Sequence, residues 1–275
     1  MTRGTLFVCP TPIGNLEDIT LRTLRTLKEV DLIAAEDTRR TIKLLNHYKI
    51  KKPLTSYHEH NKWEKGEILL KNLKGGEDIG LVSDAGMPGI SDPGEELIKS
   101  SIEENIEVEV LPGPTASITA LILSGLSTDK FVFEGFLPSN KKDRIKELER
   151  LRNEQRTIII YESPYRLLNM LRDIKEVLGN RQISISRELT KVYEETFRGT
   201  VEEGIENFKE QKKGEFVIIV EGGEIEEKNP FEKISIKDHI RMYIEEGCSK
   251  KDAVKKVALE RKLPKNQVYK ESIEL

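Results

Sequence analysis

The segment Ser83–Gly94 carries the residue types best suited to holding a ligand. It contains three glycines, two prolines and two aspartates, and it follows an apolar run that ends at Val82. From Glu95 onward the pattern is helical. Glycines let backbone approach a ligand closely and prolines stiffen the loop, so Asp84 would be held firmly beside whatever binds. Such a loop at the end of a strand normally faces a ligand crevice, although loops rich in Gly and Pro are also ordinary surface turns.

Two further loops of the same kind follow other apolar runs. Pro10–Asn15 follows Leu6–Val8, and Pro112–Ala116 follows Val108–Leu111 and opens a helix. If the three preceding strands are parallel, their loops converge on one crevice. The sequence has no G-x-G-x-x-G among these loops and no G-x-x-x-x-G-K-[ST], so the dinucleotide and P-loop fingerprints are absent.

The elements that must position these loops alternate along residues 4–126, which is the pattern of a doubly wound parallel sheet. Strands are expected at 6–8, 31–35, 54–58, 79–82 and 107–111, with helices at 16–30, 41–48, 64–73, 95–104 and 115–123. A second α/β unit follows, with strands at 131–136, 157–161, 182–188, 196–199 and 216–220. Its strands are crowded, which indicates a mixed sheet. We therefore predict an α/β protein with domains at 1–125 and 130–222 and a small helical domain at 233–275.

The charge distribution and the cysteine content indicate which partners and which cellular compartment to expect. The net charge of the 275 residues is −3, and residues 233–275 carry 11 Lys/Arg against 7 Asp/Glu, so a basic tail of +4 follows a body of −7. This asymmetry suits a nucleic-acid partner, although lysines on solvated helix faces would give it too. The two cysteines, Cys9 and Cys248, lie far apart, and no run approaches membrane-spanning length. We expect a cytoplasmic protein without disulfides or membrane contact.

Seven segments follow one another at a characteristic spacing. They are Pro10–Asn15, Ala35–Arg39, Ser56–Asn61, Ser83–Gly94, Leu111–Thr115, Gly135–Pro138 and Tyr161–Pro164. Together they resemble the ribosomal RNA small-subunit methyltransferase I family, the bacterial branch of the tetrapyrrole-methylase superfamily, strongly over residues 4–222. The resemblance implies transfer of a methyl group from S-adenosylmethionine to the 2′-hydroxyl of a cytidine in the decoding region of 16S ribosomal RNA. It also implies two α/β domains of the tetrapyrrole-methylase type and a homodimer.

Residues for the methyl donor follow from the loops and from the resemblance. Asp84 is of the right type to take a ribose hydroxyl or the ammonium group of the donor. The loop amides, Met87 and Ala116 could line its adenosine and methionyl ends. The resemblance adds positions where the superfamily holds its cofactor, and second-domain strands contribute to the same cleft. The expected set is Pro10, Asp84, Gly86, Met87, Thr115, Ala116, Tyr161 and Arg187.

Methylation of a 2′-hydroxyl calls for a general base within hydrogen-bond reach of that hydroxyl. Three carboxylate or imidazole groups compete, namely Glu36, His58 and Glu162, and the sequence does not rank them. Each has a structural alternative: Asp37 beside Glu36 could cap a helix, and Glu162 could stand at a helix start. His58 and His60 would share one face of a strand, but no third ligand is near in sequence, so we expect no metal.

RNA recognition needs cations for phosphates and pockets for an unstacked nucleotide. In the body the expected contacts are Arg39, Arg40, Lys141 and Arg144, with Lys43, Lys142, Arg166, Arg187 and Lys191 as further candidates. In the tail Lys250, Lys251 and Lys255 head a basic patch that Lys256, Arg261 and Lys262 extend. The expected partner is 16S ribosomal RNA or the small ribosomal subunit.

Two other functions remain open at this point. Relatives in the superfamily methylate tetrapyrrole rings, so the acceptor could be a small molecule. Polar residues such as Glu36, Arg39 and His58 suit a polar acceptor better than a large apolar one. A module that binds RNA without catalysis would have lost its donor site, whereas the Gly/Pro loops and Asp84 are in place.

Overall fold

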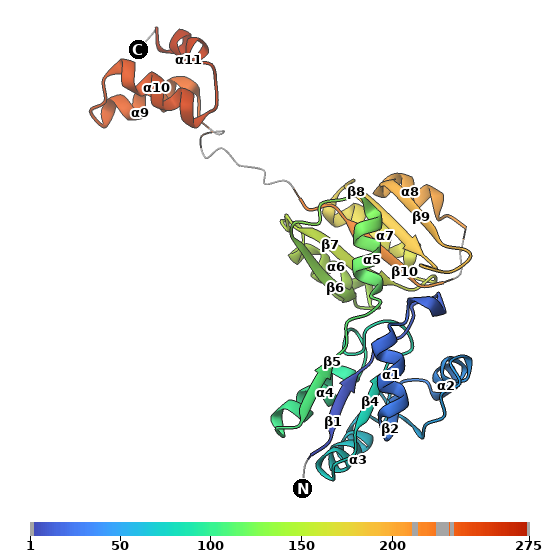
Figure 1. Ribbon diagram of the computed structural model, residues 1–275. Helices are drawn as coiled ribbons and strands as arrows, with labels where there is room; N and C mark the ends of the chain where they lie inside the picture. The colour runs from blue at the N-terminus through green and yellow to red at the C-terminus, as the bar shows by residue number, and fades with distance from the viewer. Residues whose placement is uncertain (1–2, 211–213, 224–230, 232–233, 274–275) are drawn as a thin grey trace. The chain divides into compact units, whose positions relative to one another are not determined.

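The structure, a computed structural model, describes residues 3–210, 214–223, 231 and 234–273. The chain divides into two compact units, Met1–Gly223 and Glu224–Leu275. Among the described residues, the first unit holds two five-stranded sheets and the second holds three helices. Figure 1 labels most of these elements along the chain. In the described part of the chain, no helix has the length and apolar character needed to span a membrane.

The first sheet is entirely parallel. Its strands are β1 (Thr5–Val8), β2 (Leu32–Ala35), β3 (Leu54–Ser56), β4 (Ile79–Val82) and β5 (Glu107–Val110), in the order β3-β2-β4-β1-β5. The connecting helices are α1 (Leu21–Glu29), α2 (Thr38–His47), α3 (Lys62–Lys74) and α4 (Gly94–Glu103). The central strands are buried on both faces and read as unbroken apolar runs, as expected for a parallel sheet covered by helices.

Neighbouring residues of one strand serve opposite faces of this sheet. Leu81 belongs to a core cluster with Leu73 of α3 and Leu97 of α4, whereas Val82 packs in another cluster with Leu27 of α1. Helices α1 and α2 therefore cover one face and α3 and α4 the other. All five strands end at the same edge of the sheet, which is where the predicted loops begin.

The second sheet is mixed, as predicted. Its strands are β6 (Phe131–Phe136), β7 (Thr157–Glu162), β8 (Gln182–Arg187), β9 (Glu195–Thr200) and β10 (Phe216–Val220), in the order β6-β7-β10-β8-β9. Only the β6–β7 pair is parallel. Helices α6 (Lys141–Arg150), α7 (Leu167–Leu178) and α8 (Val201–Asn207) pack on one face, where Ile158 and Ile160 point.

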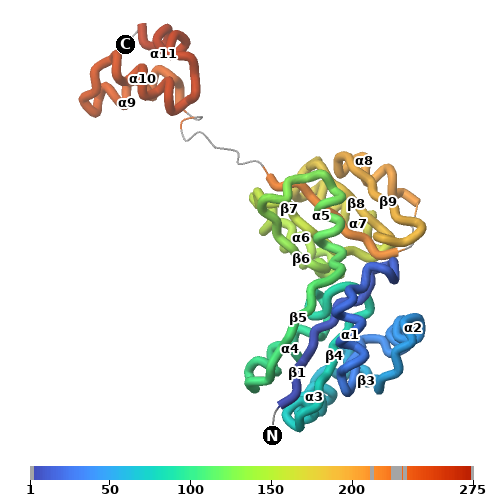
Figure 2. The backbone as a smooth tube through the Cα atoms, in the orientation of Figure 1, coloured from blue at the N-terminus to red at the C-terminus, as the bar shows by residue number. Residues whose placement is uncertain are grey.

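The other face of the second sheet is covered by α5 (Ala116–Ser124). Ala120 and Leu121 of this helix pack on Ile159, Val217 and Ile219. This helix was predicted to close the first domain, at residue 125. It packs on the second sheet instead, so the chain leaves the first sheet before α5 begins, along the tube drawn in Figure 2.

Two helix boundaries differ from the sequence prediction for local reasons. The helix expected at 16–30 is divided into a 3-10 turn (Leu16–Asp18) and α1, because the Thr20 hydroxyl accepts the Thr23 amide and caps α1 there. Helix α2 begins at Thr38 rather than 41, because the Asp37 carboxylate accepts the Arg39 amide. This moves Arg40 onto the first turn of α2.

The second compact unit is helical, with α9 (Ile236–Glu245), α10 (Lys250–Glu260) and α11 (Lys265–Ser272). Its core is a cluster that includes Ile240, Val254, Val257 and Val268. Residues 233, 274 and 275 of the predicted domain lie outside the described residues.

Candidate active site

Three loops meet at the carboxyl edge of the first sheet. Thr11 and Gly86 exchange two backbone hydrogen bonds, at N···O distances of 2.9 and 3.0 Å, which join the loop after β1 to the loop after β4. A Cβ atom on Gly113 would lie 2.3 Å from Cγ of Pro10, so only glycine lets the loop after β5 pack there. The loops therefore form one structure, as their position after parallel strands predicted.

A cavity of about 360 Å³ opens beside these loops, and we call it the Met87 cavity. Six of the eight residues predicted to hold the cofactor line it: Asp84, Gly86, Met87, Thr115, Ala116 and Tyr161. Its size lies within the range of about 300–1,000 Å³ that is usual for ligand sites. The second sheet completes its wall through Phe136 and Val217, together with Leu189 of the loop after β8.

Asp84 lies at the polar end of the Met87 cavity. Its backbone amide donates to Oε2 of Glu36 at 3.1 Å, and its Oδ2 lies 3.1 Å from Nη1 of Arg40. Its Oδ1 is buried and has no hydrogen-bond partner among the described residues. A buried carboxylate oxygen without a partner costs free energy, so a ligand that donates a hydrogen bond to it would bind favourably.

Glu36 shares this end of the cavity. Burial raises the pKa of its carboxyl group, and the nearby carboxylates of Asp84 and Asp92 raise it further, whereas the Asp84 amide and Arg40 lower it. The net result is a carboxyl group that takes up a proton at higher pH than an ordinary glutamate. A carboxylate tuned upward in this way is a stronger general base near neutral pH.

An aromatic wall closes the cavity on the side of the second sheet. Tyr161 makes edge-to-face contacts with Phe133 and Phe136, at ring-centroid distances of 5.0 and 5.5 Å. Its hydroxyl oxygen accepts the backbone amide of Ser117 at 3.1 Å, at the start of α5. Burial raises the pKa of Tyr161, so this phenol stays protonated and serves as a fixed apolar surface.

A second cavity of about 550 Å³ adjoins the first, and we call it the Lys43 cavity. Ser83, Asp84, Ala85, Arg40 and Lys191 line both cavities, so they meet at the Asp84 carboxylate. The residues found only in the Lys43 cavity include Lys43 of α2 and Pro164, which follows β7. Three cations, Arg40, Lys43 and Lys191, thus line a cavity that opens next to the polar end of the Met87 cavity. The carboxylates of Asp84, Glu188 and Glu215 line it too, and Nζ of Lys191 lies 2.9 Å from Oε1 of Glu188.

Four of the predicted catalytic and cofactor-binding residues lie outside both cavities. Pro10 supports the loops from beneath Gly113, and Arg187 pairs with Glu195, with a distance of 2.7 Å from Nε to Oε2. His58 and Glu162 also do not line either cavity. Of the three candidate bases, Glu36 is therefore the one that the fold places in a cavity.

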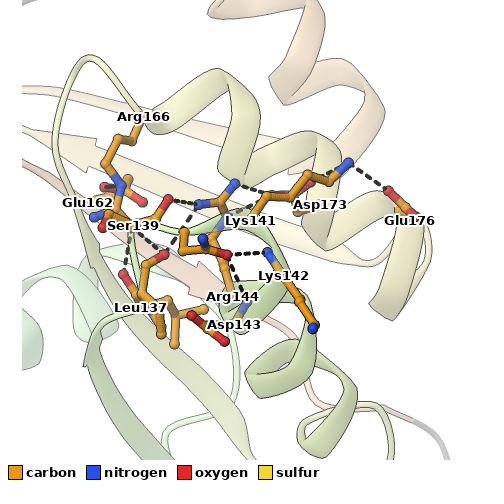
Figure 3. A network of polar contacts seen from close by, with 12 residues as sticks. Leu137, Ser139, Lys141, Lys142, Asp143, Arg144, Glu162, Arg166, Asp173 and Glu176 are labelled. Carbon is orange, nitrogen blue, oxygen red and sulfur yellow. Dashed lines mark hydrogen bonds and ion pairs between the residues drawn. The ribbon is translucent and has the colours of Figure 1, made fainter.

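Glu162 belongs instead to a buried polar network, shown in Figure 3. Its side chain is fully buried, and its Oε1 accepts the Ser163 amide at 2.7 Å and lies 3.2 Å from Nε of Arg166. Arg166 donates to the carbonyl oxygens of Leu137 and Pro138, so the network fixes the loop after β6. Burial raises the pKa of Glu162, while the Ser163 amide and Arg166 lower it.

Arg144 lies in the same network and is buried. Its guanidinium pairs with Asp173 at 2.6 Å, two residues that Figure 3 labels. It also donates to the carbonyl oxygens of Pro138 and Ser139. A buried guanidinium with these partners holds the fold rather than a phosphate. Lys141 remains exposed, with its Nζ 3.6 Å from Asp173 and from Glu176.

The other predicted RNA contacts lie at the surface. Arg39 forms a two-point pair with Asp37, at 3.0 and 2.8 Å, which holds the pKa of Asp37 down at about 2. In the second unit Lys250, Lys251 and Lys255 are all exposed on α10. Among the residues that the structure describes, no group of three or more His, Cys, Asp or Glu could hold a metal ion.

Several lining residues were missed by the sequence prediction. Glu188 and Glu215 line both cavities, and Asp92 lines the Met87 cavity. Asp92 stands within the predicted loop and accepts the amides of Gly89 and Gly94, a pattern that the S-D-P-G sequence could have indicated. Glu188 adopts a left-handed φ of 52°, and no feature of its sequence context signals this.

Comparison with known proteins agrees with this architecture. Residues 5–204 match the family model of the tetrapyrrole (corrin/porphyrin) methylases. The ribosomal RNA small subunit methyltransferase I of Halalkalibacterium halodurans is 53% identical over 271 residues, which cover 97% of this chain and 94% of that protein. The protein of the same name from Thermotoga maritima is 51% identical over 222 residues, which cover 80% of this chain and 100% of that protein.

A solved structure shares the fold at low sequence identity. The uroporphyrin-III C-methyl transferase of Thermus thermophilus, complexed with S-adenyl homocysteine, has a TM-score of 0.55 and 19% identity, and the match covers 78% of this chain and 97% of that chain. The chain belongs to the tetrapyrrole methylase family and, within it, to the group of ribosomal RNA small subunit methyltransferase I proteins. The predicted fold class and the prediction of a methyltransferase are confirmed.

Proposed function

We propose that this protein transfers a methyl group from S-adenosylmethionine to the 2′-hydroxyl of a cytidine in the decoding region of 16S ribosomal RNA. The observation that carries the proposal is the pair of adjoining cavities that share Asp84, one suited to the donor and one to the acceptor. The names of the relatives supply the ribosomal RNA substrate. A cytoplasmic location follows from that substrate, and the homodimer rests on the family resemblance alone.

The Met87 cavity fits the methyl donor in shape and charge. The donor is a cation at its sulfur and carries an ammonium group, and the cavity presents the carboxyl groups of Asp84, Glu36 and Asp92. The buried Oδ1 of Asp84 would accept a hydrogen bond from a ribose hydroxyl or from the ammonium group. Met87, Leu189 and Tyr161 offer an apolar surface for the adenine ring. Bound there, the donor supplies the methyl carbon for an in-line displacement.

The Lys43 cavity fits an unstacked nucleotide. Arg40, Lys43 and Lys191 would neutralise its phosphates, and the junction at Asp84 leads to the donor. Holding both reactants at fixed loops supplies the alignment that a displacement needs. The tail lysines Lys250, Lys251 and Lys255 would add sequence-independent contacts to the RNA backbone.

Glu36 is the proposed general base. It lines the Met87 cavity beside the junction, and its pKa is raised mainly by burial. In this role its carboxylate would accept the proton of the 2′-hydroxyl as the new C–O bond forms. Its hydrogen bond from the Asp84 amide fixes its orientation toward the same loop that holds the donor.

The experiment that tests the function uses S-adenosylmethionine with a labelled methyl group and small ribosomal subunits that lack this modification. We expect label on one cytidine ribose in the decoding region. Label on a base, on another RNA region or on an added tetrapyrrole would contradict the proposal. A parallel reaction with the Asp84→Ala protein at the same donor concentration should give much less label, which separates enzymatic transfer from contamination.

A further inference from the structure

Two tyrosine side chains protrude into solvent from the loops that line the Lys43 cavity. Tyr165 is 83% exposed and directly follows Pro164, and Tyr193 is 76% exposed and lies two residues beyond Lys191. Neither ring belongs to a hydrophobic core cluster of the described residues. Neither ring lines the Lys43 cavity itself, but each follows a lining residue within two positions, so both belong to the loops around that cavity. An exposed ring contributes little to folding, which leaves both rings free to contact a ligand of the cavity.

Hydrogen bonds to buried residues hold the turn that carries Tyr165. Glu162 is fully buried and accepts the Ser163 amide, and the amide of Arg166 donates to the Ser163 carbonyl at 3.1 Å, which closes the turn around Tyr165. The Arg166 guanidinium then ties the turn to the carbonyls of Leu137 and Pro138, as Figure 3 shows. An exposed ring on a fixed backbone loses little entropy when a partner binds.

The loop that carries Tyr193 is fixed as well. Thr190 adopts a left-handed φ of 65°, its amide donates to the Glu194 carboxylate at 2.6 Å, and its hydroxyl accepts the amide of Asn15 at 2.8 Å. The last bond joins this loop to the loop after β1. Lys191 of the same loop lines the cavity. Both tyrosines are therefore presented by loops that hydrogen bonds hold in place.

We propose that Tyr165 and Tyr193 are stacking platforms for the nucleotides that flank the target nucleotide in a single-stranded stretch of RNA. This inference rests on the proposed function and describes how the proposed acceptor site binds the RNA on either side of the target nucleotide. Every base has a flat face that stacks on a phenol ring, and such rings beside phosphate-binding cations are the usual means of holding single strands. With Arg40 and Lys43 on the phosphates, the two rings would keep the neighbours in place while the target enters the cavity.

The test compares full-length Tyr165→Ala, Tyr193→Ala and the double variant with two matched controls. Tyr165→Phe keeps the ring, and Val192→Ala removes a 94% exposed side chain without a ring from the Tyr193 loop. We measure kcat and KM for methyl transfer to small ribosomal subunits, and affinity for S-adenosylhomocysteine by calorimetry. Each alanine variant should raise KM roughly 5- to 150-fold, with kcat at saturation and S-adenosylhomocysteine affinity retained. Both controls should behave like the wild type.

Three outcomes would overturn the inference. They are an unchanged KM in the double variant, the same loss in Tyr165→Phe as in Tyr165→Ala, and a change in oligomeric state in place of a change in KM. The last would show that the rings contact a second copy of the chain. Failure of the proposed function looks different, because the wild-type protein itself would then transfer no methyl group to the subunit.

Discussion

Asp84→Asn is the substitution that most directly tests how the Met87 cavity holds the donor. The change removes the negative charge that the structure places at the junction of the two cavities and leaves the size of the side chain nearly unaltered. The amide oxygen of asparagine can still accept a hydrogen bond from the donor, so what the change removes is the charge on the buried acceptor. Hydrogen bonds to charged groups contribute about 1.5–3 kcal/mol and neutral ones about 0.5–1.5 kcal/mol, so the difference of about 1–1.5 kcal/mol corresponds to roughly 5- to 15-fold weaker binding.

The same substitution should leave stability nearly unchanged. Asp84 also pairs with Arg40, but the two side chains are 29% and 62% exposed, so solvent screening limits the pair to about 0–1 kcal/mol. The assay is titration calorimetry with S-adenosylhomocysteine, together with a thermal melt of each protein. A melting temperature close to that of the wild type shows that any loss of affinity arises in the site.

Asp37→Asn is the matched control, because it removes a partly exposed carboxylate only one residue from Glu36 and outside both cavities. Asparagine caps a helix as well as aspartate does, so α2 should keep its start. We expect this variant to bind S-adenosylhomocysteine like the wild type. Wild-type affinity in Asp84→Asn, or an equal loss in Asp37→Asn, would refute the reasoning.

Three further predictions follow from the site and its supports. Glu36→Gln should lower kcat by about 10²–10⁴ while S-adenosylhomocysteine still binds, and full activity in the variant would exclude Glu36 as the base. The activity of the wild type should fall as the pH drops through the raised pKa of Glu36, since a protonated carboxyl group cannot accept the proton. Arg144→Ala should destabilise the protein by about 3–5 kcal/mol, because it leaves the buried Asp173 charge without its guanidinium partner. The control is Lys142→Ala at the start of the same helix, and equal melting temperatures of the two variants would contradict this prediction. A chain ending at Gly223 should keep its affinity for S-adenosylhomocysteine but bind RNA more weakly, and unchanged RNA binding would exclude the tail as a contact. If three tail lysines contact phosphates, the plot of the logarithm of the RNA-binding constant against the logarithm of the salt concentration should become shallower by about 2 in slope.

The parallel sheet and the meeting of the loops could be anticipated because their causes are local. Unbroken apolar runs such as Ile79–Val82 indicate parallel strands, and Gly and Pro after each run mark loops at one edge. The packing of Gly113 on Pro10 and the pairing of Thr11 with Gly86 are direct consequences.

The features of the site that could not be predicted from the sequence depend on contacts between residues far apart in the chain. Glu162 and Arg144 have the same residue types as catalytic or RNA-binding groups. Their burial is set by the packing of α6 and α7 on the second sheet, through Asp173 and Arg166. Helix α5 could not be assigned to a sheet from its own apolar pattern either, because any apolar face would accept it. The ranking of the three candidate bases therefore required the cavity.

The most direct test is a crystal structure of the protein with S-adenosylhomocysteine. It should show the ligand in the Met87 cavity, with a hydroxyl or the ammonium group on Oδ1 of Asp84 and the sulfur facing the Lys43 cavity. A ligand bound elsewhere, or bound here with its sulfur turned away from the junction at Asp84, would contradict the assignment of donor and acceptor sites.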